Sequence, residues 1–155
     1  MTGDHTLARF SADHDAPGQA RRLLVDMLRA RGCQRSDVEA AALVLSELAS
    51  NAVQHAGSCF SVHLTIEGAT LRIGVEDGGP GADTAMPVRR AHGLGVVSAL
   101  TRRWGVQATA AGKLVWAELS LHPARLGGRE RDRRGRGRGL VRAELHGVLD
   151  GAVPK

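Results

Sequence analysis

The sequence predicts an α+β sandwich, in which helices cover one face of a sheet. Segments with strand and helix patterns follow one another in the order strand, two helices, two strands, loop, helix and two strands. Short turns join the consecutive strands, which indicates that these strands pair antiparallel. The chain has 155 residues, of which 43% are hydrophobic and 24% charged, as expected for one globular domain.

The first half of the domain is expected to contain one strand and two helices. Weak alternation of apolar and polar side chains predicts an edge strand over residues 6–12. Apolar side chains recur at helical spacing over residues 17–31, which predicts the first helix. Ser36 is expected to be the N-cap of a second helix that continues to Ala56, because Glu39 would complete a capping box with it.

The second half of the domain is expected to hold four strands and one helix. In order, the pattern predicts strands at 59–67 and 70–76, a loop at 77–92, a helix at 94–103 and strands at 105–110 and 113–121. The folded domain is therefore expected to span residues 1–123. Residues 124–155 form an Arg/Gly-rich tail that is expected to be disordered, with apolar spacing over 140–150 that allows a short helix.

The positive charge of the chain is concentrated in this tail. The formal net charge is +5, yet residues 1–123 hold as many acidic as basic side chains. Residues 124–142 hold eight arginines against two acidic residues. With two Phe, two Trp and no Tyr, the chain has few side chains on which bases could stack. Nucleic acid is therefore expected to bind weakly at most, and through the tail.

The protein is expected to be cytoplasmic. No window approaches the roughly 18 consecutive apolar residues of a membrane-spanning helix, and the polar N-terminus has no apolar core of a signal peptide. Cys33 and Cys59 are too few for a disulfide framework and are not spaced as a metal site. These features predict thiols that stay reduced.

The expected second helix carries a line of polar side chains. At about 100° per residue, Glu47, Asn51 and His55 span only roughly 80° of its surface. A carboxylate, an amide and an imidazole in one line on a largely apolar helix favour a binding site, and the alternative is a solvated stripe. The opposite face is expected to be core and consists of Val38, Ala41, Leu45, Ala49 and Ala52.

Two glycine-rich segments follow this helix in the sequence. Asp77 ends an expected strand and is followed by Gly79 and Gly81, so its carboxylate could accept a hydrogen bond from a flat heterocycle while the backbone approaches closely. Gly93 and Gly95 lie at the start of the next expected helix, whose free N–H groups suit a phosphate. Taken singly, each segment is better explained as an ordinary turn.

The order of the three motifs is more specific than any one of them. E-L-x-x-N-A-x-x-H, D-x-G-x-G and G-L-G-V resemble the N, G1 and G2 boxes of the GHKL, or Bergerat-fold, ATPase superfamily. The closing stretch GKLVWAEL, residues 112–119, is similar to the last strand of the small anti-sigma regulatory branch of serine/threonine kinases in this superfamily. The resemblance covers roughly residues 6–121. It implies a two-layer sandwich of helices on a mixed, mostly antiparallel sheet, with ATP and Mg²⁺ as cofactors.

The resemblance implies a role for each matching residue of the first two boxes. Asp77 would accept a hydrogen bond from the adenine amino group, in a pocket shaped by Gly79 and Gly81. Asn51 would bind the Mg²⁺ that bridges the phosphates. Glu47 would be the general base toward an attacking hydroxyl group.

The other matching residues would serve the phosphates. Gly93, Leu94 and Gly95 would close over them, and His55 would support the phosphate end of the N box. The sequence departs from the family pattern in the last strand, where many relatives have a threonine that helps to hold the adenine and this chain has Lys113. The segment between the G1 and G2 boxes is also short.

The resemblance implies an ATP-dependent serine/threonine protein kinase of the anti-sigma type. Such a protein sequesters a sigma factor and phosphorylates an antagonist protein. The alternative is a non-catalytic nucleotide-binding module that acts only by sequestering its partner. A homodimer is a further expectation, because relatives are often dimers and the strand at 6–12 would leave a free edge.

Overall fold

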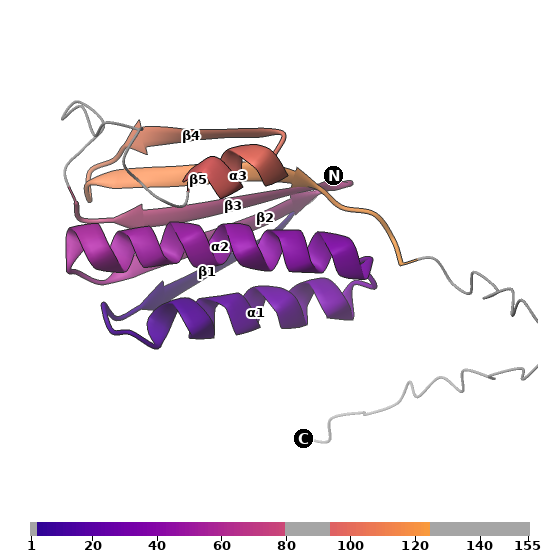
Figure 1. Ribbon diagram of the computed structural model, residues 1–155, viewed down its shortest axis with the longest axis horizontal. Coiled ribbons are helices and arrows are strands. Elements are labelled where there is room, and N and C mark those ends of the chain that lie inside the picture. Colours follow the sequence, from indigo (N-terminus) through magenta and orange to yellow (C-terminus); the bar gives the residue numbers. More distant parts are fainter. Residues whose placement is uncertain (1–2, 80–93, 125–155) are drawn as a thin grey trace, which may run out of the picture.

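The computed structural model describes residues 3–79 and 94–124, and a five-stranded sheet lies at its centre (Figure 1). The strands are β1 (Asp4–Phe10), β2 (Phe60–Glu67), β3 (Thr70–Asp77), β4 (Arg103–Ala108) and β5 (Lys113–Ser120). The helices are α1 (Ala16–Ala30), α2 (Arg35–Ala56) and α3 (Leu94–Leu100). The strand order is β1-β2-β3-β5-β4, so β5 lies between β3 and the edge strand β4.

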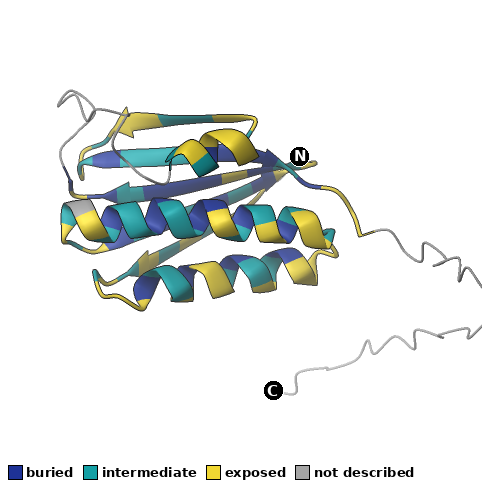
Figure 2. Cartoon of the chain, in the orientation of Figure 1, coloured by how far each residue is buried: buried dark blue, intermediate teal, exposed yellow. Residues whose placement is uncertain are grey.

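The helices form a second layer on one face of the sheet (Figure 1). Along β2, buried residues alternate with half-buried ones, as expected for a strand with only one covered face. The buried residues of sheet and helices form one core (Figure 2), whose largest members include Leu24, Leu28, Leu45, Phe60, Leu64, Leu71 and Ile73. The predicted α+β sandwich is confirmed, and the pairings of the described strands are all antiparallel.

The predicted apolar face of α2 is also confirmed. All of its expected members are buried, with exposed fractions of 6% or less: Val38, Ala41, Leu45, Ala49 and Ala52. Burial of a valine or leucine side chain contributes about 1.5–3 kcal/mol. This face therefore holds α2 firmly against the sheet, and with it the polar side chains that α2 carries.

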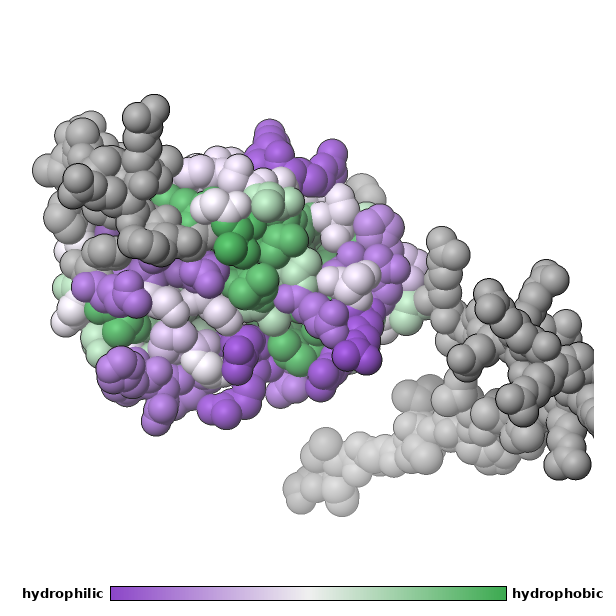
Figure 3. Space-filling model, in the orientation of Figure 1, coloured by the Kyte–Doolittle hydropathy of each residue, from purple (hydrophilic) through white to green (hydrophobic). Residues whose placement is uncertain are grey.

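Apolar side chains are also found on the surface of the helical layer. Figure 3 shows them gathered in the middle of this face, over the region of α2 and α3. Leu43 of α2 and Leu100 of α3 are 45% and 38% exposed.

No helix within the described ranges is long and apolar enough to span a membrane. Cys33 is half-buried and Cys59 is exposed, and neither is paired in a disulfide within the described residues.

Helix α3 ends earlier than predicted, at Leu100 rather than at residue 103. Arg103 instead begins β4, where it lies opposite Glu118 of β5 and donates from Nη2 to Oε2 at 2.7 Å. Arg72 of β3 reaches the other oxygen of the same carboxylate, from Nη1 to Oε1 at 3.1 Å. These ion pairs join three neighbouring strands, and they hold residue 103 in the sheet instead of in the helix.

The predicted capping box at the start of α2 is wrong. The helix begins at Arg35, and its N-cap is Gln34, whose side chain makes no capping hydrogen bond. Glu39 accepts a hydrogen bond from Arg35 at 2.6 Å instead, in an exposed ion pair. Ser36 falls inside the first turn because the chain is already held at Gln34, whose N–H donates to the carbonyl of His122 at 2.9 Å.

Asp37 fastens the segment after β5 to the start of α2. Its Oδ2 accepts a hydrogen bond from the backbone N–H of His122 at 2.6 Å, and Nδ1 of the same residue lies 3.0 Å away. Nε2 of Gln34 donates to Oδ1 at 3.0 Å. Burial acts to raise the pKa of Asp37, but these hydrogen bonds outweigh it and hold the pKa below its ordinary value of 3.8.

Asp37→Asn is expected to lower the free energy of unfolding by about 1–3 kcal/mol at neutral pH. Because the folded-state pKa is lowered, this stabilisation is present above the ordinary pKa and is lost as the pH falls through the lowered value. The difference between wild type and variant should therefore be large at about pH 5 and above and shrink below about pH 4. Urea unfolding at several pH values measures it, with Asp26→Asn on the exposed side of α1 as control. A difference that persists at low pH would contradict this role.

Candidate functional site

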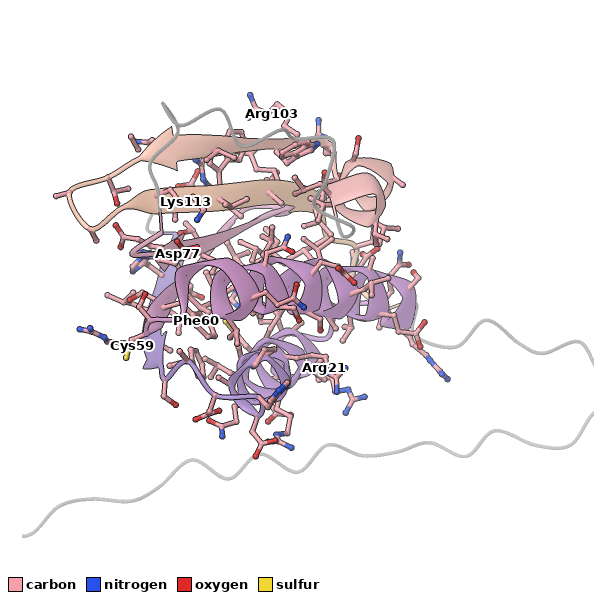
Figure 4. All side chains as sticks on the ribbon, turned by 60° about the vertical axis from the view of Figure 1, so that its left-hand side comes forward. Arg21, Cys59, Phe60, Asp77, Arg103 and Lys113 are labelled. Atoms are coloured by element: carbon pink, nitrogen blue, oxygen red, sulfur yellow. The ribbon has the colours of Figure 1, made fainter. Side chains whose placement is uncertain are left out.

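Two of the residues predicted to hold a base, Asp77 (Figure 4) and Gly79, lie at the end of β3 and next to the last turn of α2. Asp77 is the last residue of β3, and its side chain is 3% exposed. Its Oδ1 accepts two hydrogen bonds, from the backbone N–H of Gly79 at 2.8 Å and from Nζ of Lys113 at 2.8 Å. One oxygen of this carboxylate is thus already bonded within the protein.

Lys113 reaches Asp77 because of the register between two strands. It is the first residue of β5 and lies directly opposite Asp77 in the antiparallel pair of β3 and β5. Its side chain is 8% exposed, so both charges of the ion pair are buried. An unpaired buried charge costs several kcal/mol, and each partner therefore depends on the other. Where many relatives have a threonine, this chain therefore has a lysine that forms an ion pair with Asp77.

Two glycines allow the end of β3, the last turn of α2 and the turn between β4 and β5 to approach one another closely. A Cβ on Gly79 would lie 2.6 Å from Nζ of Lys113 and 3.6 Å from Cβ of Ala56, the last residue of α2. Gly112, in the turn between β4 and β5, has φ +149°, and a Cβ there would lie 2.3 Å from the carbonyl oxygen of Asp77. Neither position has room for a side chain. At Gly79, the ammonium group of Lys113 is the group that lies close to the backbone.

Glu47 and Asn51 are half-buried and lie one turn apart on α2. At a rise of about 1.5 Å per residue, Asn51 is about 7.5 Å and Glu47 about 13.5 Å along the helix axis from Ala56. Because Ala56 lies next to Gly79, the polar line starts near the Asp77 end of the sheet and runs away from it along α2. His55 belongs to the last turn of α2, and its side chain lies outside the described residues.

The described part of the third motif is the first turn of α3. Leu94 is half-buried and packs against the core, and Val97 is fully buried. Gly95 is exposed, and a Cβ there would meet no atom within 4 Å. Gly81 and Gly93 lie outside the described residues. The structure thus fixes α3 through its apolar side chains, and packing alone does not explain the glycine at position 95.

The same end of β3 also borders a cavity of about 510 Å³ that the sequence motifs did not indicate. Its lining residues are Arg9, Ser58, Cys59, Ser61, Glu76, Asp77, Gly78 and Ala111. Arg9, Ser61 and Glu76 lie side by side across β1, β2 and β3 and alternate with residues that face the helices. The cavity is therefore on the open face of the sheet, away from the polar line of α2.

The donor chemistry along α2 suits a magnesium ion bound together with phosphates. Asn51 offers a neutral amide oxygen as a ligand, while Glu47, one turn away, is the carboxylate that is expected to act as the base. Mg²⁺ prefers such oxygen ligands and keeps water and phosphate oxygens in its remaining positions. Among the described residues, no group of three or more His, Cys, Asp and Glu side chains is placed to hold a metal ion.

Sequence reasoning did not foresee the pairing of Lys113 with Asp77 or the contact of Gly112 with the Asp77 backbone. A weak signal was present, because Lys113 stands where many relatives have a threonine. Gly112 directly precedes it in the same motif. The missing information was the register of β5 on β3, which brings the two strand ends together.

Comparisons with known proteins agree with this fold. Residues 10–143 match the family described as histidine kinase-like ATPase domain. The fold is similar to the crystal structure of the RsbU and RsbW domains of Rv1364c from Mycobacterium tuberculosis, with a TM-score of 0.64 and 23% sequence identity. That match covers 80% of this chain and 34% of the other, so the chain spans about a third of the solved chain it matches. The search of curated proteins found no match to this chain. Because the family match includes α2, β3 and β5, the chain belongs to the histidine kinase-like ATPase domain family, as the order of its three boxes predicted.

Proposed function

We propose that the chain binds Mg-ATP with the adenine at Asp77 and the phosphates along the polar line of α2. The observation that carries this proposal is that Asp77 and Gly79 lie close to the end of α2, the helix that bears Asn51 and Glu47. A buried carboxylate beside a backbone without side chains suits a flat base. Membership of an ATPase domain family supports ATP as the ligand.

Asn51 and Glu47 suit two different tasks in this proposal. Asn51 would be a ligand of Mg²⁺, and the bound ion would neutralise charge on the phosphates. Glu47, one turn farther from the base site, would accept the proton of an attacking serine or threonine hydroxyl. The remaining residues of the three boxes would close the site around the phosphates: His55, Gly81, Gly93, Leu94 and Gly95.

The activity that we propose is phosphorylation of a serine or threonine on an antagonist protein, by a regulator that also sequesters a sigma factor. The resemblance of the boxes and of the last strand to anti-sigma regulatory kinases supports this. The similar fold of a structure that contains an RsbW domain supports it as well. β1 is an edge of the sheet, and its free side offers a second copy of the chain a place to pair.

A second candidate function is a non-catalytic module that acts only by sequestering its partner. The ion pair between Lys113 and Asp77 favours it, because the carboxylate that would hold the base already has a charged partner. The two functions differ in whether the partner becomes phosphorylated. A partner that binds equally well with and without ATP, and never accepts phosphate, would favour the module.

Calorimetric titration with Mg-ATP tests the nucleotide site. Wild type is expected to bind, and Asp77→Asn is expected to weaken binding at least about tenfold, because the new amide donates where the adenine amino group also donates. Glu76→Gln is the matched control, since Glu76 precedes Asp77 but belongs to the open face of the sheet. If neither wild type nor a variant that lacks Lys113 binds at millimolar ATP, the proposal is wrong.

A further inference from the structure

We propose that Lys113 is an internal competitor of the nucleotide base. Its ammonium group occupies Oδ1 of Asp77 and the space beside Gly79 in the free protein, and a base that donates to Asp77 and stacks on Gly79 can enter only when Lys113 moves away. The inference rests on the proposed function, because it concerns the same site. It assigns to Lys113 the control of nucleotide affinity, a role that the three sequence boxes do not contain.

The position of the ammonium group is the first argument. Nζ of Lys113 lies 2.8 Å from Oδ1 of Asp77, and it would be only 2.6 Å from a Cβ placed on Gly79. The group therefore fills the space that Gly79 leaves open beside the carboxylate. A flat base that donates to Asp77 and stacks close to the Gly79 backbone needs this same space. Lys113 and the base exclude one another at this point.

The strength of the pair is the second argument. Both side chains are more than nine-tenths buried, and the lysine donates a charge-assisted hydrogen bond. The amino group of adenine is a neutral donor, so its hydrogen bond to the carboxylate lacks the attraction between two opposite charges that the ammonium group of Lys113 provides. The base therefore displaces Lys113 only with help from other contacts of the nucleotide, such as those of the phosphates along α2.

The chemistry of lysine fits an occupant that can leave. Its ammonium is a compact charge on a flexible four-carbon stem and is strongly hydrated once it reaches solvent. Lys113 also lies in the first position of β5, directly after the turn that contains Gly112. The side chain can therefore change its direction at the end of a strand while the pairing of β5 with β3 is kept.

Two substitutions of Lys113 test the competition in the whole chain. Lys113→Thr removes the charge and most of the stem, and Lys113→Met removes the charge but keeps a stem of similar length. Calorimetry is expected to show Mg-ATP binding at least about tenfold tighter than in wild type for both variants, with Thr at least as tight as Met. Arg102→Thr removes a positive charge from an exposed position near β4 and is the control. Circular dichroism confirms that each variant is folded.

The outcomes separate this inference from the proposed function. Tighter binding by the variants, including binding where wild type shows none, supports the competition. Equal or weaker binding by the variants, with measurable binding by wild type, overturns the competition and leaves the nucleotide site in place. If no version of the chain binds, the proposed function fails and the inference fails with it.

Chemical modification of the wild-type protein gives a second measurement that needs no substitution. The sequence has only two lysines, Lys113 and Lys155, so acetylation of each can be followed by mass spectrometry. The buried amine of Lys113 is expected to react slowly in the free protein and faster when saturating Mg-ATP drives it away from Asp77. A rate that ATP leaves unchanged or lowers would mean that Lys113 stays in place, and would overturn the inference.

Discussion

Glu47→Gln is expected to leave Mg-ATP affinity unchanged and to lower phosphate transfer to a protein substrate by about 100- to 10,000-fold. The glutamine keeps the shape of the side chain on α2 but cannot accept the proton of the attacking hydroxyl. Glu47 lies about 13.5 Å along the helix from Ala56, too far to touch a base held at Asp77. Its loss should therefore affect transfer and spare the contacts that hold the adenine.

The matched control for this experiment is Glu39→Gln. Glu39 lies on the same helix two turns earlier, where it is exposed and paired with Arg35. This variant is expected to keep both binding and transfer. Radiolabelled ATP and the co-purified antagonist protein provide the transfer assay, and calorimetry provides the affinity. Transfer that survives in Glu47→Gln would remove Glu47 from the chemistry and leave the nucleotide site unaffected.

The parts of the fold that the sequence predicts well are those set by neighbouring residues. The hairpin of β2 and β3 turns at Gly68, which has φ +56°, and α2 ends at Gly57, which has φ +58°. A left-handed conformation at these points favours glycine, so the signal is local and readable. The apolar face of α2 was likewise readable, because its spacing follows from the helix itself.

The parts that the sequence misses depend on residues far away along the chain. Ser36 has the side chain of an N-cap, but the chain is held two residues earlier, at Gln34, by His122, which lies 88 residues farther along the chain. Helix α3 ends at Leu100, and Arg103 belongs to β4, where it pairs with Glu118 of β5. Local propensity cannot include such contacts, so boundaries shift although the elements themselves are correct.

The candidate site shows the same division. The described residues of each box lie on the element where the sequence puts them, with Asn51 on α2, Asp77 at the end of β3 and Leu94 at the start of α3. The partner of Asp77 was not readable, because β4 intervenes in sequence between β3 and β5. Only the strand order, in which β5 lies next to β3, brings Lys113 opposite Asp77.

The ion pair of Asp77 and Lys113 is expected to produce the largest effect on stability. Asp77→Asn leaves a buried ammonium without its anion and should lower the free energy of unfolding by about 3–5 kcal/mol. Lys113→Met should cost less, because the N–H of Gly79 still donates to the carboxylate. Urea unfolding followed by the fluorescence of Trp104 and Trp116, in β4 and β5, measures both variants.

The double variant Asp77→Asn/Lys113→Met decides whether the two charges act as a pair. It removes both charges, and replacing a buried pair by uncharged side chains of similar volume is often close to neutral. It should therefore be more stable than Asp77→Asn alone, with a coupling energy of about 2 kcal/mol or more.

The exposed pair of Arg35 and Glu39 provides the comparison, because its coupling is expected to be only about 0.3–0.5 kcal/mol. A coupling between Asp77 and Lys113 as small as that of the exposed pair would mean that the ammonium group is not held at the carboxylate. A lysine that is not held there cannot compete with a base, so the stability cycle and the nucleotide titration must agree on whether Lys113 occupies the site.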